Sequence, residues 1–148
     1  MSAYLFTYFT ETNKGDQEYI WFAVSRDGLH FTDLGNDEPI LKAKLGTKGI
    51  RDPFIVYDEK LKKYFIIATD LLTTSGNWYN FSHKGSRSLF IWESEDLINW
   101  SEERLVEVGI PKAGCVWAPE AIFCKEKDAW FVFFASCANS SLPNVIVY

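Results

Sequence analysis

Two short segments place a carboxylate next to a proline at the start of an apolar run. "GIRDPFIV" carries Asp52 directly before Pro53, and "AGCVWAPEAIF" carries Glu120 directly after Pro119. The residues that follow are aromatic and β-branched, which is typical of strands. Proline is tolerated at the first residue of a strand, where no ladder partner is needed. A charged residue just before it is expected to project into a cavity, so Asp52 is a candidate for acid–base chemistry.

The segments around these carboxylates repeat along the chain. "RDPFIVYDEKLKKYFIIATD" aligns with "WAPEAIFCKEKDAWFVFFAS", which places Pro53 on Pro119, 66 residues later. "FAVSRDGLHFTDL" aligns with "IWESEDLINWSEE", which places Ser25 on Ser94, 69 residues later. A long internal period with several short strands in each unit indicates a propeller or a related array.

Each complete unit is predicted to hold four strands. In the middle unit the runs are Phe54–Tyr57, Tyr64–Thr69, Ser88–Glu93 and Leu105–Val108. The N-terminal unit offers three runs, which leaves its first strand missing: Tyr4–Thr10, Tyr19–Ser25 and His30–Leu34. The C-terminal unit offers its first two strands and then Asn144–Tyr148 as the start of a third. No segment has a helical period.

These patterns predict an all-β fold made of four-stranded antiparallel sheets. The chain is expected to form one partial β-propeller domain over residues 1–148, with units at approximately 4–36, 50–108 and 115–148. This amounts to about two to two and a half blades of a five-bladed propeller.

Composition narrows the possible partners. Apolar residues make up 47 % of the chain and aromatic residues 17 %, which suits both strand cores and sugar-binding surfaces. The net charge of −5 and the lack of a basic run argue against nucleic acid. No apolar run reaches the length of about 18 residues that a membrane helix needs. The three cysteines form no Cys-x-x-Cys motif, so we expect free thiols, no metal and no cofactor. With no signal peptide visible, a cytoplasmic setting is favoured.

The order of these motifs resembles the front part of glycoside hydrolase family 43. The resemblance is carried by "GIRDPFIV", "YFIIATDL", "GSRSLFIWESEDLINWS" and "AGCVWAPEAIF", and it covers nearly the whole chain. It implies a five-bladed β-propeller that hydrolyses arabinose- or xylose-containing polysaccharides or oligosaccharides with inversion. It also implies Asp52 as the general base. Trp117 and Glu120 match a motif that borders the sugar pocket, with Glu120 standing where the family usually has Asp.

The resemblance also implies two acidic residues from later blades, and these match nothing in this chain. Five units would need roughly 330 residues, so the chain alone is expected to be inactive. An inverting pair made of Asp52 and Glu120 is the alternative, because such carboxylates stand ~6.5–9.5 Å apart. A non-catalytic module that binds sugar or assembles with itself is a second reading. Incomplete end units expose sheet edges, which predicts a homodimer or a companion chain, joined through Tyr4–Thr10 or Asn144–Tyr148.

Three further side chains are candidates for contact with a carbohydrate substrate. Asp70 ends a strand in "ATDLL", where it serves either the site or the following turn. Trp78, with Tyr79 beside it, lies in a long segment between two strands and offers either a sugar platform or packing over the sheet edge. Arg87 either donates to sugar hydroxyls and holds Asp52 ionised, or forms a structural ion pair.

Four other residues are assigned structural positions or left as isolated side chains. Arg51 is expected to point away from Asp52, and Trp100 is expected to pack between blades. His30 and His83 stand apart from other metal-ligating residues, so neither predicts a metal site.

Overall fold

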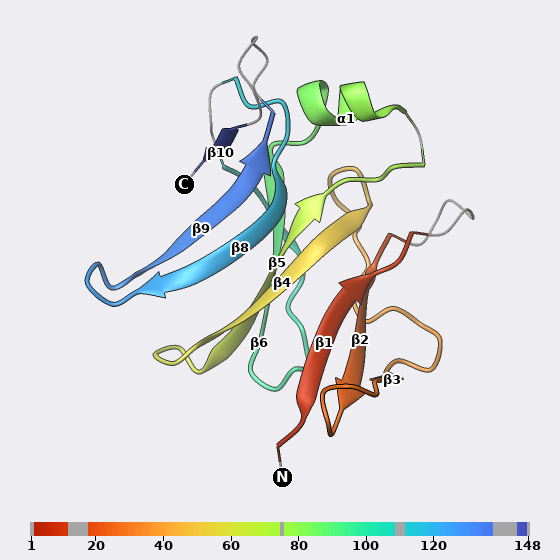
Figure 1. Cartoon of the computed structure of the whole chain (residues 1–148), viewed down its shortest axis with the longest axis vertical. Coiled ribbons are helices and arrows are strands. Elements are labelled where there is room, and N and C mark those ends of the chain that lie inside the picture. Colours follow the sequence, from red (N-terminus) through yellow and green to blue (C-terminus); the bar gives the residue numbers. More distant parts are fainter. Residues whose placement is uncertain (1, 12–17, 75, 109–111, 138–144, 148) are drawn as a thin grey trace.

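The computed structural model describes residues 2–11, 18–74, 76–108, 112–137 and 145–147. Within these ranges the chain forms three antiparallel sheets, which lie side by side (Figure 1). The first sheet has the order β1-β2-β3, the second β4-β5-β6-β7 and the third β10-β9-β8. The all-β class and the partial propeller predicted from the sequence are confirmed.

The described strands fall close to the predicted runs. Their bounds are β1 Tyr4–Phe9, β2 Ile20–Ser25, β3 Thr32–Asp33, β4 Ile50–Asp58, β5 Lys63–Asp70, β6 Ser88–Ser94, β7 Arg104–Glu107, β8 Trp117–Cys124, β9 Ala129–Ser136 and β10 Val145–Val147. The termini Asn144 and Tyr148 of the last predicted run lie outside the described residues.

One strand begins earlier than predicted and encloses its proline. In β4, Ile50 pairs with Asp70 and Arg51 with Thr69, and the register then shifts before Phe54 pairs with Ile67. Pro53 therefore sits at a β-bulge inside the strand, not at its first residue. A bulge accommodates proline because the extra residue is left out of the hydrogen-bond ladder.

The segment after β5 contains a helix, which corrects the expectation that none would form. Helix α1 runs from Trp78 to Lys84, and its N-cap is Asn77, whose side-chain oxygen accepts a hydrogen bond from the Asn80 amide at 2.9 Å. Asparagine is among the preferred N-cap residues. Seven residues are too few to display a helical period in the sequence.

The turns that leave β2 and β6 have the same geometry. The Ser25 and Ser94 hydroxyls each accept an amide hydrogen bond three residues on, at 2.8 and 2.9 Å. Asp27 and Asp96 each accept one from an amide three residues on, at 2.9 and 2.7 Å. The sequence repeat between these segments is therefore a repeat of turn structure.

The hydrophobic core lies between neighbouring sheets. Between the first and second sheets it contains Ile20, Phe22, Ile50, Ile66, Phe90 and Trp92. Trp100 reaches across from the second sheet and contacts Phe22 edge-on, with ring centroids 5.8 Å apart, as expected for a residue between blades. The second and third sheets are joined by the Trp130 indole, whose N–H donates to Asp58 Oδ2 at 2.7 Å.

Of the cysteines, Cys115 is buried and Cys124 and Cys137 are half-buried. Burial raises the pKa of the Cys115 thiol to about 11. Within the described ranges, no helix has the length and apolar character needed to cross a membrane.

Candidate active site

The start of β4, the end of β5 and the start of β8 meet at one end of the sheets. The register pairs the beginning of β4 with the end of β5, and β8 packs against both strands. Helix α1, which follows β5, lies at the same end (Figure 1). Most of the predicted site residues belong to these four elements, so the fold brings them to one region.

Asp52 and Ala118 occupy matching β-bulges in adjacent sheets. Asp52 has φ 50° and Ala118 has φ 47°, and each is followed by proline. A left-handed backbone is costly for residues other than glycine, although Asp tolerates it better than most. Bulges re-aim side chains relative to a regular strand. The bulge in β4 therefore gives Asp52 a direction that a regular strand would not.

Thr69 holds the carboxylate of Asp52. Its hydroxyl donates to Asp52 Oδ2 at 2.9 Å. The hydroxyl oxygen, Thr69 Oγ1, also accepts a hydrogen bond from the Ala118 amide at 2.8 Å. Thr69 is 0 % exposed and lies on the central strand β5. Three strands from two sheets thus meet at the Thr69 hydroxyl. This role is not visible in the sequence, because a hydroxyl in an apolar strand has no distinguishing pattern.

Trp78 forms an aromatic pair with Trp117, the residue before Ala118. Their rings meet edge-on with centroids 6.2 Å apart, and Trp78 is 59 % exposed. The two tryptophans are brought together because α1 lies against the segment before β8. A Cβ at Gly114 would lie 2.4 Å from the Ser82 carbonyl oxygen, so only glycine permits this approach.

The other predicted substrate-binding residues have protein partners or face outward. Asp70 is 2 % exposed, and its Oδ1 accepts hydrogen bonds from the amide and hydroxyl of Thr47, both at 2.7 Å. It therefore holds the turn before β4. Arg87 forms an ion pair with Glu107. Glu120 lies on β8 just past the bulge, pairs with Phe133 across the strands and is exposed.

Arg51 faces the first sheet, away from the Trp78–Trp117 pair. Its guanidinium lies 3.4 Å from Glu18 and 3.5 Å from Glu11, and it stacks over the Phe9 ring at 4.6 Å. These contacts agree with the structural position expected for it.

The two histidines have local partners. His30 Nδ1 lies 2.7 Å from Asp27, and His83 stacks on Tyr79 with ring centroids 4.3 Å apart. Across the described residues, no three His, Cys, Asp or Glu side chains gather closely enough to hold a metal ion.

Comparison with known proteins shows which family the chain belongs to. The model of a family described as a probable glycosyl hydrolase domain, related to family 43, matches residues 1–144. The chain belongs to this family. The resemblance read from the sequence is therefore confirmed.

Individual relatives agree with the family assignment. An α-L-arabinofuranosidase from Bifidobacterium longum subsp. longum is 31 % identical over 135 residues, which is 88 % of this chain and 13 % of that protein. The exo-β-1,3-galactanase structure from Clostridium thermocellum matches with a TM-score of 0.62 at 11 % identity, over 93 % of this chain and 30 % of that one. The exo-β-1,3-galactanase from Phanerochaete chrysosporium, solved with galactose, matches with a TM-score of 0.57 at 9 % identity, over 91 % and 30 %. This glycosyl hydrolase domain thus spans a small part of the curated relative and under a third of these structures.

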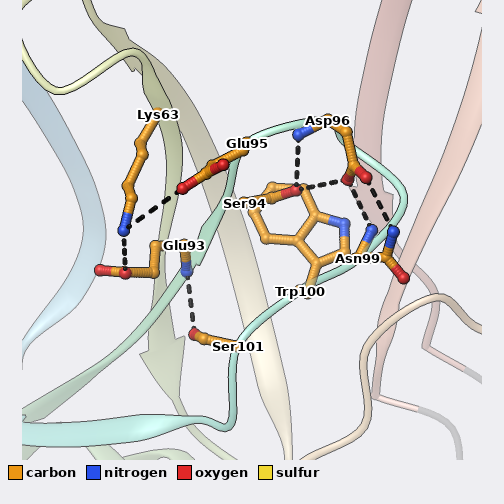
Figure 2. Close-up of a pocket in the computed structure, with 8 residues that line it drawn as sticks. All are labelled: Lys63, Glu93, Ser94, Glu95, Asp96, Asn99, Trp100 and Ser101. Carbon is orange, nitrogen blue, oxygen red and sulfur yellow. Dashed lines mark hydrogen bonds and ion pairs between the residues drawn. The ribbon is translucent and has the colours of Figure 1, made fainter.

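A polar pocket lies at the opposite end of the second sheet. Figure 2 shows its lining around the turn after β6, where Lys63 approaches Glu93 at 2.8 Å and Glu95 at 4.0 Å. The hydrogen bond from Lys63 lowers the pKa of Glu93. The Asp96 carboxylate accepts hydrogen bonds from the backbone and side chain of Asn99, both at 2.7 Å. These groups stabilise the turn, so the Asp52 end of the glycosyl hydrolase domain remains the candidate site.

Proposed function

We propose that this domain contributes the general base of an inverting glycosidase that acts on arabinose- or xylose-containing polysaccharides or oligosaccharides. The observation that carries this proposal is the Asp52 carboxylate, which lies at a bulge of an edge strand, accepts a hydrogen bond from Thr69 and belongs to the same end of the sheets as the Trp78–Trp117 pair. In the proposed reaction, Asp52 takes a proton from a water molecule as that water attacks the anomeric carbon. A second carboxyl group protonates the leaving oxygen.

We propose arabinofuranosides as the first substrate class to be tested and xylosides as the second. The similarity to an α-L-arabinofuranosidase supports this order. Hydrolysis of aryl α-L-arabinofuranoside and aryl β-D-xyloside by the full-length protein tests the substrate class. Proton NMR of the first-formed sugar tests inversion, because the anomeric configuration of the product must be opposite to that of the substrate. The proposal would be rejected if neither glycoside is hydrolysed.

We propose that Trp78 and Trp117 form a platform for the sugar ring. An exposed indole presents an apolar face of the kind on which the C–H groups of a pyranose or furanose can lie. Glu120 is proposed to border the sugar-binding site next to this platform. Asp70 and Arg87 are proposed to support it indirectly, since Asp70 fixes the turn before β4 and Arg87 is paired with Glu107.

The general acid is proposed to come from a further blade outside this domain, so that the domain alone is inactive. The limited share of the galactanase structures that it covers supports this view. Activity of the isolated domain that disappears with Glu120→Gln would instead assign the acid to Glu120.

A non-catalytic role, in which the domain binds sugar or assembles with itself, is the second proposal. The specific observation in its favour is an apolar cross-strand pair on the third sheet, Ile122 and Phe131, which are 62 % and 49 % exposed. Exposed apolar sheet faces commonly mark interaction surfaces. We propose that a second copy of the chain covers this face.

A further inference from the structure

We infer that Thr69 is a positioning residue for Asp52, whose carboxylate it orients. This inference rests on the proposed role of Asp52 as general base. It begins from the two hydrogen bonds that meet at one oxygen atom, Thr69 Oγ1.

The direction of these hydrogen bonds follows from the chemistry of the groups. A hydroxyl has one hydrogen to donate and lone pairs to accept. The Ala118 amide can only donate, so it occupies a lone pair of Thr69 Oγ1. The single hydroxyl hydrogen is then directed to Asp52 Oδ2. Because Thr69 is fully buried, solvent water does not compete for either bond.

The surrounding strands hold Thr69 still. Its backbone pairs with Arg51 on one side and Leu89 on the other, so it lies in the middle of the four-stranded sheet. Its β-branched side chain has few rotamers available. A donor held rigidly against one carboxylate oxygen fixes the direction in which that carboxylate points. A base must be aimed at the attacking water to take its proton, so it benefits from this donor.

The inference also explains why the second and third sheets meet at this point. The Ala118 amide reaches the hydroxyl only because the bulge in β8 turns it towards β5. Thr69 therefore orients Asp52 and also holds the third sheet against the second through the Ala118 amide.

The test compares Thr69→Val, which removes the hydroxyl but keeps the shape, with Thr69→Ser, which keeps the hydroxyl. In the full-length protein, Thr69→Val is expected to lower kcat about tenfold with a smaller effect on KM. Thr69→Ser should keep kcat near the wild-type value. Ser94→Ala, which removes a buried hydroxyl beside an aspartate at the far end of the sheet, should leave kcat unchanged.

A measurement that needs no turnover separates this inference from the proposed function. A crystal structure of Thr69→Val should show the Asp52 carboxylate turned from its wild-type direction, and a crystal structure of Thr69→Ser should show that direction kept. If Thr69→Val does not fold, the wild-type crystal structure still provides a test, since the Thr69 hydroxyl must lie within hydrogen-bond distance of Asp52 Oδ2. An unchanged carboxylate direction in Thr69→Val, or a serine variant as impaired as the valine variant, would overturn the inference. Full activity of Asp52→Asn would reject the proposed base without affecting the structural result.

Discussion

Asp52 and Ala118 are structural counterparts, each at the bulge of the strand that begins its sheet and each followed by proline. Their φ angles of 50° and 47° are nearly equal, yet one position carries a carboxylate and the other a methyl group. The repeat thus supplies two similarly shaped strand starts, of which only one bears an acidic side chain. The bulge is therefore a feature of the repeated backbone, and the carboxylate is specific to the Asp52 position.

Replacing Trp78 with alanine is expected to weaken carbohydrate binding without unfolding the domain. The indole is largely exposed, and its ring meets that of Trp117 edge-on. Loss of an aromatic contact should weaken the Kd for an arabino-oligosaccharide by about 3- to 10-fold. Isothermal titration calorimetry measures this directly. Tyr57→Ala, at an exposed aromatic residue on the far end of β4, serves as the control, and equal effects of the two variants would contradict the platform.

The aspartates of the repeated turns should make the fold sensitive to acid. Hydrogen bonds from the Asn99 backbone and side chain hold the pKa of Asp96 well below its usual 3.8. The backbone hydrogen bond from His30 does the same for the pKa of Asp27. As the pH falls below about 4, the unfolded chain takes up protons before the folded one. The stabilisation present at neutral pH is therefore expected to be lost progressively through that range.

Thermal unfolding at several pH values tests this expectation. Asp96→Asn should lower Tm at pH 7 and reduce the fall in Tm between neutral and acidic pH, because the group responsible has been removed. Glu95→Gln removes a neighbouring exposed carboxylate and should change both quantities less. A Tm that is insensitive to Asp96→Asn at pH 7 would show that the turn contributes nothing to stability.

The strands and turns of this fold could be predicted because their signals are local. Alternating aromatic and β-branched residues mark the strands, and the Ser-x-Asp segments mark the turns that leave β2 and β6. Helix α1 was missed because its seven residues are fewer than periodicity needs. The early start of β4 was missed because a bulge is not visible in a list of residue types.

The candidate site was only partly visible in the sequence. Asp52 stood out beside its proline, and Trp78 and Trp117 could be named, but nothing in their positions showed that their rings touch. Thr69 was overlooked because its role arises from a contact among three strands that are distant in sequence. Asp70 looked equally suited to the site and to a turn. Its hydrogen bonds to Thr47 connect it to the turn that precedes β4, not the one that follows β5.

Self-association through the third sheet is expected to depend on Phe131. Light scattering at micromolar concentration should give the mass of a dimer, and Phe131→Lys should give that of a monomer, since a charge cannot be buried in an apolar interface without a partner. Leu29→Lys alters an exposed turn residue and should leave the mass unchanged. If the wild type is a monomer, a second copy does not cover this face, and a different partner chain would have to be sought.

The most direct test of the account is the turnover of Asp52→Asn in the full-length protein on an aryl α-L-arabinofuranoside. The change removes the base while keeping the size of the side chain. It is expected to lower kcat by about 10²–10⁴-fold with Tm nearly unchanged. Asp58→Asn, at the opposite end of the same strand, controls for the loss of a carboxylate and should retain activity. An Asp52→Asn variant that keeps more than about a tenth of the wild-type kcat would contradict the assignment of Asp52 as the general base.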